Sequence, residues 1–396
     1  MPEREKIVAG AVRHAIGLPH NAQELADALG ILGARRQTIH LCGASSKRLM
    51  AGPIEPADAV VSTAGMTKVL QYEPRDLTIS VEAGIRYAEL NRIVAQNRQM
   101  IPLDPPFSET ATIGGIVASN SSGPRRRLYG TARDLVIGMK FATLEGKLVQ
   151  SGGMVVKNVA GLDMGKLLIG SFGTLAAIAV VNFKLLPRPA AEATFLLSFD
   201  TLDEAVGARD GALKSVLPIA AMDLLNPLAT AQLGHKGYLL AITVGGNSGV
   251  IERSRRELAG PHVAVLEGAE AARFWRNVED YTPHFLDKFA HGAVVRASCT
   301  LAQVKDVFGS FEAAAIARAG SGVCYGYFSR AEAGARWVAG AVERGWKAVI
   351  EFAPEDQKPN LDLWPSPGSD FAMMKKIKQM FDPNHLLNRG RLFRLI

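Results

Sequence analysis

The first 190 residues alternate short apolar runs with glycine-bearing turns, which predicts a domain of short strands and helices. Helical spacing of apolar positions predicts helices at residues 21–30, with Asn21 as N-cap and Gly30 at the end, and at residues 87–97. The turn at residues 74–76 predicts a hairpin between two of the strands. The predicted strands are residues 38–42, 59–62, 69–73, 77–81, 135–142, 147–150 and 175–186.

The pattern changes after the prolines at positions 187 and 189, which predict a domain boundary. Beyond it, short strands alternate with helices, an arrangement typical of an α+β layer. We expect strands at residues 194–199, 220–225, 238–244, 294–298 and 322–328, and helices at residues 202–217, 250–258, 301–319 and, with a basic surface, 371–380.

Composition sets limits on the class of protein. A chain of 396 residues with 48% hydrophobic and 21% charged residues is globular and long enough for two domains. The net charge of +7 is scattered, and its densest run is only Arg125, Arg126 and Arg127, so we expect no nucleic acid partner. The three cysteines lie far apart in the sequence, which argues against a zinc or iron–sulfur site held by this chain alone.

Targeting signals are absent from the predicted elements. The N-terminus has mixed charges and no apolar core of a signal peptide. Residues 167–183 lack charge but contain several glycine and polar residues, so we interpret them as a loop and a buried strand, with no transmembrane segment. These features, with reduced thiols, predict a cytoplasmic protein, and peripheral attachment to the inner face of a membrane through partners is left open.

Three glycine-rich segments carry the candidate chemistry. They are residues 43–46 after a strand, residues 102–123, and residues 161–178. Glycine allows a backbone to approach a ligand closely, and converging amides with Ser and Thr hydroxyls can bind a diphosphate. None of the segments has the glycine spacing of a Rossmann dinucleotide site or of a P-loop.

The sequence resembles the FAD-binding domain of the vanillyl-alcohol oxidase superfamily, also called the PCMH-type domain. Within that superfamily it is most similar to the FAD-binding E subunits of bacterial glycolate oxidases. The resemblance implies an α+β fold with a PCMH-type domain of two subdomains at residues 1–189, a ferredoxin-like cap at residues 190–370, and a tail at residues 371–396 that returns to the first domain. The matching residues are Pro102-Leu-Asp104, Thr112-Ile-Gly-Gly115, Ala118-Ser-Asn120, Tyr129-Gly130, Arg133-Asp134, Lys157 to Asp163, Gly170 to Leu175, and Phe381 to Leu392.

The resemblance also implies the cofactor and the residues that bind it. Members that attach FAD covalently use a histidine in the first glycine loop, whereas this loop has none and His40 lies on the strand before it, so non-covalent FAD is expected. Residues 43–46 and 112–115 would contact the diphosphate, Ser119 and Asn120 the ribityl chain or ring, and residues 173–178 the adenosine. The expected FAD-binding residues are Gly43, Ala44, Ser45, Ser46, Pro102, Asp104, Thr112, Gly114, Gly115, Ser119, Asn120, Gly123, Gly161, Gly173, Thr174 and Ile178.

One motif departs from the family pattern. Catalytic members carry H-x-G-D-G-N-x-H, whose histidines hold a divalent metal that binds the hydroxy acid. The corresponding residues here are 318–325, with Arg318 and Tyr325 in place of the histidines, Ser321 in place of the aspartate and Val323 in place of the asparagine. A guanidinium cannot bind a metal. No metal site is therefore expected, and the other histidines, such as His235, His284, His291 and His385, lack ligand spacing.

The resulting functional hypothesis is an accessory or electron-relay flavin subunit of a glycolate oxidase complex that converts glycolate to glyoxylate. Its expected partners are a catalytic flavin subunit and an iron–sulfur subunit, with a small 2-hydroxy acid as substrate of the complex. Two alternatives stay open, a standalone FAD-dependent dehydrogenase of D-lactate-like acids and a flavin-free scaffold. Arg125 and Arg126 are interpreted as solvated, with contact to FAD phosphates or to an acidic partner surface as the alternative. Arg133 is expected to have a structural partner in or near Asp134.

Overall fold

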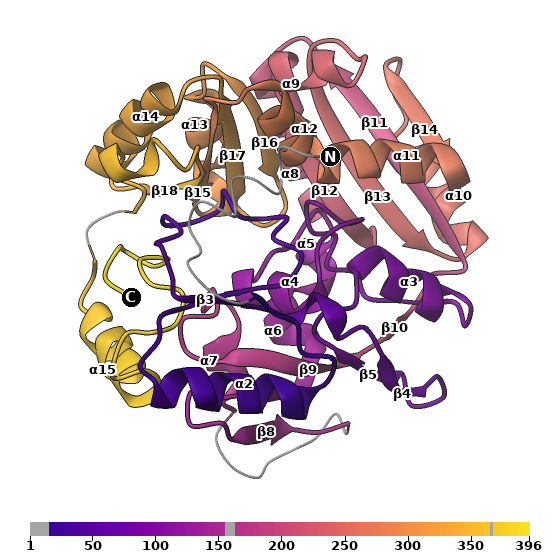
Figure 1. The fold of residues 1–396 in the computed structure, drawn as a ribbon. Coiled ribbons are helices and arrows are strands. Elements are labelled where there is room, and N and C mark those ends of the chain that lie inside the picture. Colours follow the sequence, from indigo (N-terminus) through magenta and orange to yellow (C-terminus); the bar gives the residue numbers. More distant parts are fainter. Residues whose placement is uncertain (1–15, 155–162, 365–366) are drawn as a thin grey trace.

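Two separate sheets form the half of the molecule drawn in indigo to magenta in Figure 1. The computed structural model describes residues 16–154, 163–364 and 367–396. One sheet is parallel, in the order β1 (Ile16–Gly17), β3 (Ala59–Ser62) and β2 (Ile39–Cys42). The other is antiparallel, in the order β4 (Val69–Glu73), β5 (Thr78–Glu82), β9 (Ala177–Lys184), β7 (Val136–Ala142) and β8 (Leu148–Gly152).

Helices cover these two sheets and connect their strands. Asn21 caps α2 (Ala22–Ala34), because its side chain accepts a hydrogen bond from the Glu24 amide at 3.0 Å. The helix continues through Gly30, where a Cβ would lie 3.0 Å from Gly146 Cα in the turn between β7 and β8. The remaining elements are η1 (Thr63–Gly65), α3 (Tyr87–Ala95), α4 (Ile113–Ser119), α5 (Arg126–Tyr129), α6 (Ala132–Leu135), α7 (Gly165–Leu168) and the strand pair β6 (Gln99–Met100) and β10 (Leu186–Pro187).

The second half of the chain forms one eight-stranded antiparallel sheet. Its strands form two groups of four. If the strands of a group are numbered 1 to 4 along the chain, they lie in the sheet in the order 4-1-3-2, and helices connect them. This is the ferredoxin-like order, present twice and joined where β12 pairs with β16. The full order is β14 (Val263–Glu267), β11 (Ala191–Phe199), β13 (Tyr238–Gly246), β12 (Ile219–Leu225), β16 (Ala314–Arg318), β17 (Val323–Phe328), β15 (Ala293–Ser298) and β18 (Lys347–Phe352).

The two faces of this cap sheet have different partners. One face packs against α8 (Leu202–Lys214), α10 (Ser248–Glu257), α13 (Val304–Gly309) and α14 (Ala331–Glu343). The other packs against α11 (Gly268–Glu279), α12 (Tyr281–Lys288) and side chains of the first domain that include Met50, Phe107 and Phe172. The cap therefore sits with one face of its sheet on the first domain. The other cap elements are α9 (Pro227–Gln232), η2 (Leu301–Gln303) and η3 (Lys358–Asn360).

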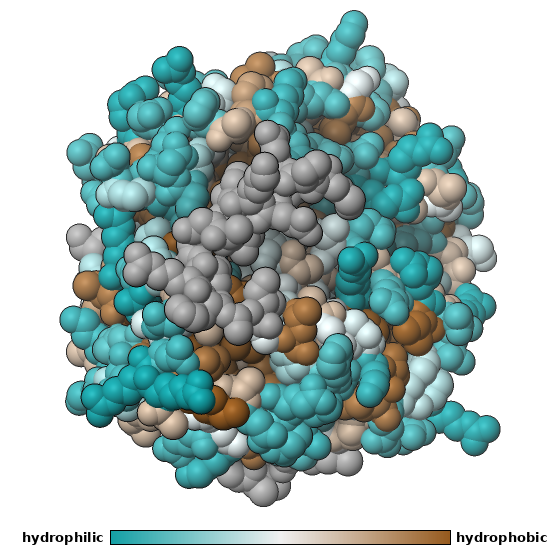
Figure 2. All heavy atoms as spheres, viewed as in Figure 1, coloured by the Kyte–Doolittle hydropathy of each residue, from teal (hydrophilic) through white to brown (hydrophobic). Residues whose placement is uncertain are grey.

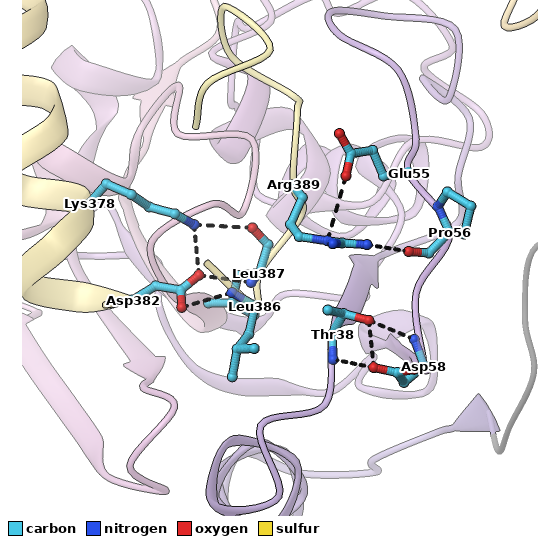
Figure 3. A network of polar contacts seen from close by, with 9 residues as sticks. All are labelled: Thr38, Glu55, Pro56, Asp58, Lys378, Asp382, Leu386, Leu387 and Arg389. Atoms are coloured by element: carbon cyan, nitrogen blue, oxygen red, sulfur yellow. Dashed lines mark hydrogen bonds and ion pairs between the residues drawn. The ribbon is translucent and has the colours of Figure 1, made fainter. Parts of the chain in front are cut away.

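The C-terminal segment runs back along the first domain (Figure 1). After α15 (Phe371–Phe381), the chain lies beside β2, where the Ile39 amide donates to the Leu386 carbonyl at 2.8 Å. The buried pair of Lys378 and Asp382, 2.7 Å apart, holds this segment, since Asp382 also accepts the amides of Leu386 and Leu387 (Figure 3). The expected basic helix is present, with Lys375 and Lys376 exposed and Lys378 buried.

Most of the expected elements are present, and two segments differ. Residues 301–319 were expected as one helix but form η2, α13 and strand β16, because Ala314–Arg318 pairs with β12 and β17 on both sides and tertiary pairing overrides the helix propensity of alanine. Residues 113–119, expected as part of a loop, form the short helix α4 capped by Thr112. Strands β14 and β18 and helices α11, α12 and α14 were not predicted.

The α+β fold class with a ferredoxin-like cap is confirmed. Within the described residues, every helix is too short or too polar to cross a membrane. Figure 2 shows that hydrophilic side chains cover most of the visible face and that hydrophobic residues form smaller groups between them.

Candidate functional site

A cavity lies where the end of β2, the start of α4, the turn before β9 and the C-terminal segment meet. Its enclosed volume is about 130 Å³, and it is open to solvent on one side. Ten of the residues expected to bind FAD line it, namely Gly43, Ala44, Ser45, Ser46, Thr112, Gly114, Gly115, Ser119, Gly173 and Ile178.

The first two glycine segments touch at the cavity floor. A Cβ on Gly43 would lie 2.2 Å from Thr112 Oγ1, so only glycine allows the loop after β2 to approach α4 this closely. Thr112 in turn caps α4, and its hydroxyl accepts a hydrogen bond from the Gly115 amide at 3.4 Å. A Cβ on Gly114 would lie 2.9 Å from the Cβ of Ala83 behind it. The glycines therefore bring two backbone segments together at one side of the cavity.

The third segment is held by a residue from the C-terminus. Asn388 donates to the carbonyls of Leu41 at 3.0 Å and Phe172 at 2.7 Å, and accepts from the Leu41 amide at 2.7 Å. Gly173 follows with a φ of +69° and lies so close that its Cβ would be 2.8 Å from Asn388 Nδ2. One side chain thus joins the strand before the first loop to the turn of the third.

The cavity wall carries positive charge that no acidic side chain neutralises completely. Among the described residues, no carboxylate pairs with Lys47, and burial lowers the pKa of its ammonium group to about 7. Arg391 donates to the Gly52 carbonyl at 2.7 Å and lies 6.0 Å from the centre of the Phe172 ring. Burial lowers the pKa of Arg391 to about 10, with Glu355 opposing the shift, so it stays charged at neutral pH.

His40 is neutral beside these cations. Burial, and then the charge of Arg391, lower the pKa of its imidazole to about 4. A cavity with an unpaired lysine, a buried arginine and glycine-lined backbone is suited to an anionic group such as a diphosphate. Sequence reasoning did not select Lys47, Arg391 or Asn388, although Asn388 belongs to the tail motif that carried the resemblance.

Other expected residues lie outside the cavity lining and shape the loops. They are Pro102, Asp104, Asn120, Gly123 and Thr174. Asp104 is buried and accepts the Arg125 amide at 3.3 Å, and a Cβ on Gly123 would lie 2.0 Å from the Asp104 carbonyl oxygen. The Thr174 carbonyl accepts from Lys378 Nζ at 2.7 Å. Asn120 ends α4 in the left-handed conformation, and Gly161 lies outside the described residues.

Arg125 and Arg127 contact the cap, so the interpretation of Arg125 as solvated is wrong, whereas Arg126 donates to Ser122 Oγ at 3.4 Å within the first domain. Arg125 forms ion pairs with Asp104 at 3.7 Å and with Glu192 at 3.5 Å. Arg127 lies against the cap, where a Cβ on Gly320 would be 2.3 Å from its Cδ. Arg133 donates to the Lys166 carbonyl at 3.3 Å and not to Asp134, which caps α6 together with Thr131.

A second charged group lies between the cap sheet and the first domain. Arg318 at the end of β16 forms a buried ion pair with Asp223 of β12, and its guanidinium lies 5.6 Å from the centre of the Tyr325 ring. Burial raises the pKa of the Asp223 carboxyl to about 6, although the Arg318 charge opposes this shift. Asp223 Oδ1 accepts no hydrogen bond from a described residue, and Arg318 Nε donates none to one. The positions that align with the metal motif therefore hold an arginine that is already paired with Asp223 of the cap.

Comparison with known proteins supports the cofactor assignment. The pattern of the FAD binding domain matches residues 14–152, and that of the C-terminal domain of FAD linked oxidases matches residues 366–392. The chain is 32% identical to glycolate oxidase subunit GlcE of Escherichia coli over 55% of this chain and 57% of that protein. It is 29% identical to glycolate oxidase subunit GlcD of Bacillus subtilis over 54% of this chain and 45% of that protein.

A longer match links the chain to D-2-hydroxyglutarate dehydrogenase of Xanthomonas citri, with 24% identity over 96% of this chain and 89% of that protein. The chain spans about half the length of the first two curated relatives. Among solved structures, 4-ethylphenol oxidase from Gulosibacter chungangensis has the same fold, with a TM-score of 0.70, 14% identity, and coverage of 95% of this chain and 88% of that chain.

The site geometry and these matches agree on the ligand. The cavity is lined by residues of the glycine-rich segments that the sequence predicted to bind a ligand, and its positive charge suits a dinucleotide diphosphate. The stretch that matches the FAD binding domain contains two of these three segments. The chain therefore carries the FAD binding domain and the C-terminal element of the FAD-linked oxidases, on the fold that these flavoproteins share.

Proposed function

We propose that the chain is the FAD-holding subunit of a heteromeric complex that oxidises a small 2-hydroxy acid of the glycolate class to the corresponding 2-oxo acid. The two glycolate oxidase subunits among its relatives and the hydroxy-acid dehydrogenase that matches nearly its whole length support this substrate class. The proposed partners are a second, substrate-oxidising flavin subunit and an iron–sulfur subunit.

The observation that carries the proposal is the cavity with an unpaired cation. Lys47 and Arg391 line the cavity together with Gly43 and Gly114. Bound FAD supplies the redox chemistry, and the protein supplies binding, orientation and charge. Asn388 fixes the relative position of the first and third segments, so that the cavity keeps its shape before the ligand enters.

The attachment of FAD is proposed to be non-covalent. The described side chains that line the cavity include one histidine, His40, and one cysteine, Cys42. His40 lies on β2 and not in the loop after it, and burial raises the pKa of the Cys42 thiol, which keeps it protonated and weakly nucleophilic. Neither is placed or activated as the histidine of the covalent members is.

The accessory role is proposed from the cap. In the catalytic members that the sequence resembles, histidines at the positions of Arg318 and Tyr325 hold the metal that binds the hydroxy acid. Here Arg318 is charged and already paired with Asp223, so these positions offer neither imidazole ligands nor a free carboxylate-binding cation. The ring of Tyr325 lies against the same guanidinium. We infer that substrate oxidation takes place on the partner flavin subunit.

An anaerobic reduction experiment tests this assignment. The isolated chain, loaded with FAD, is mixed with glycolate or D-lactate and its visible flavin spectrum is followed. We expect no bleaching with the isolated chain and rapid bleaching after reconstitution with the two partner subunits. Bleaching of the isolated chain at a comparable rate would instead identify a standalone dehydrogenase.

A further inference from the structure

The cap contains two cysteines whose thiols touch. Cys324 lies on β17 opposite Ala297 of β15, and Cys299 follows two residues after Ala297, so both cysteine side chains are on the same face of the sheet. The Cys299 amide donates to the Gly322 carbonyl at 2.8 Å, which continues the pairing of the two strands. The two side chains hydrogen-bond to each other, and both thiols are free.

The two thiols have different surroundings. Cys324 is completely buried in the apolar cluster under α13 and α14, whereas Cys299 is partly exposed at the edge of that cluster. The hydrogen bond from the Cys324 thiol, and then the charge of the buried Arg209 guanidinium, lower the pKa of Cys299 although its partial burial acts against them. The same hydrogen bond, together with burial, raises the pKa of Cys324 well above its ordinary value.

This asymmetry is that of an attacking and a resolving thiol. The more accessible sulfur, that of Cys299, ionises more readily, and the buried sulfur of Cys324 lies in contact with it. Arg209 is kept in place by a hydrogen bond from its Nη1 to the Leu301 carbonyl at 3.1 Å and by an ion pair with Asp210. The third cysteine, Cys42, lines the FAD cavity and has no cysteine beside it among the described residues.

We propose that Cys299 and Cys324 form a redox-active dithiol site that reduces hydroperoxides and closes to a disulfide. The Cys299 thiolate attacks one oxygen of hydrogen peroxide, the O–O bond breaks, and the products are a sulfenic acid and a hydroxide that takes up a proton to become water. The Cys324 sulfur then attacks the sulfenic sulfur, its proton leaves with the expelled hydroxide, and a second water forms. Two thiols are oxidised to one disulfide while one peroxide is reduced to two waters.

The site lies next to the contact between the cap and the first domain. The turn that joins β16 to β17 begins after Arg318 and includes Gly320, which packs against Arg127 of α5. A disulfide would bind β17 to the end of β15 just beyond that turn. This inference is independent of the proposed function, because it rests on cap residues that do not line the FAD cavity.

Peptide mapping of the full-length, FAD-loaded chain tests the proposal. The protein is treated with one equivalent of hydrogen peroxide, denatured in an alkylating reagent, digested without reductant and analysed by mass spectrometry. We expect a linked peptide containing Cys299 and Cys324, with Cys42 recovered in the alkylated form. The Cys324→Ser variant should instead trap dimedone on Cys299, and the Cys299→Ser variant should lose the linked peptide completely and leave Cys324 alkylated, because the attacking thiol is missing.

Circular dichroism melting of both serine variants checks that they remain folded. Peroxide that oxidises Cys299 and Cys42 at equal rates, or that converts wild-type Cys299 to a sulfinic acid without a linked peptide, would overturn the proposal.

Discussion

The proposed FAD cavity of the first domain and the Arg318–Asp223 pair on the cap both place charge inside the protein, but only the charge on the cap has a carboxylate partner among the described residues. In the cavity, Lys47 has no carboxylate partner among the described residues, and Arg391 donates to backbone carbonyls. On the cap, Arg318 is paired with a buried aspartate and lies over an aromatic ring. A partly buried cation without a carboxylate partner can accept an anionic ligand, whereas a paired cation is already neutralised. The comparison therefore separates a region arranged for a ligand from one that is complete without it.

The largest expected effect comes from breaking the cap pair. Replacing Arg318 with Met leaves the buried Asp223 carboxylate without compensation, and we expect the free energy of unfolding at neutral pH to fall by about 3–5 kcal/mol. The double variant Arg318→Met with Asp223→Leu should regain most of this loss. Urea unfolding measures both, and FAD affinity of the folded single variant should stay unchanged.

The pH dependence of this pair sharpens the test. Because the folded-state pKa of Asp223 is raised to about 6, its protonation stabilises the native state below pH ~4 and this contribution is lost as the pH rises through about 6. Without Arg318 that pKa rises further, so the single variant should lose stability over a wider pH range. A loss below ~1 kcal/mol at pH 7 would show that the pair is not buried as described.

A smaller effect is expected from the glycine at the cavity floor. Replacing Gly43 with Val forces a side chain into Thr112, at a cost of about 1–3 kcal/mol, which corresponds to a roughly 5- to 150-fold weaker affinity for FAD. The matched control is Gly207→Ala in α8, where a Cβ meets no atom within 4 Å. Flavin fluorescence titration measures both variants. Wild-type affinity in the Gly43 variant would mean that the first loop does not form the site.

The smallest expected effect is the titration of Lys47. Because burial lowers its pKa to about 7, the ammonium group is charged below that pH and neutral above it, so FAD affinity should fall by up to about tenfold between pH 7 and pH 8. His40 is neutral and Arg391 charged across this range, so neither accounts for the change. Lys47→Met should bind weakly and without pH dependence, and Lys47→Arg should bind equally at both pH values. A wild-type affinity that is constant from pH 6 to 8.5 contradicts this role.

How far the sequence predicts the molecule depends on the range of the interactions. Local signals were sufficient for the start of α2, whose cap Asn21 was expected, and for β3, whose bounds match the expected strand, but the predicted end of α2 at Gly30 is wrong because the helix continues to Ala34. The helix predicted at residues 301–319 failed because Ala314–Arg318 gains two strand partners from distant parts of the chain. No local pattern distinguishes such a central strand from an alanine-rich helix.

The prediction of the site residues was likewise limited to what local sequence patterns show. Gly43, Gly114 and Gly173 were found because glycines clustered with small polar residues indicate a backbone that lies close to a ligand or to another segment, and all three line the cavity. Lys47 and Arg391 were missed because an exposed and a buried cation look alike in a sequence. Asp104 and Thr174, which were expected at the cofactor, lie outside the cavity lining and hydrogen-bond to Arg125 and Lys378.

Flavin release on denaturation tests the central claim most directly. The purified chain, saturated with FAD and freed of excess by gel filtration, is unfolded in guanidinium chloride and passed through a membrane that retains protein. One FAD per chain should appear in the filtrate, with no flavin absorbance left on the protein. A chain that retains no flavin after gel filtration at any FAD concentration, or flavin that stays with the unfolded protein, would contradict a non-covalent FAD site in this cavity.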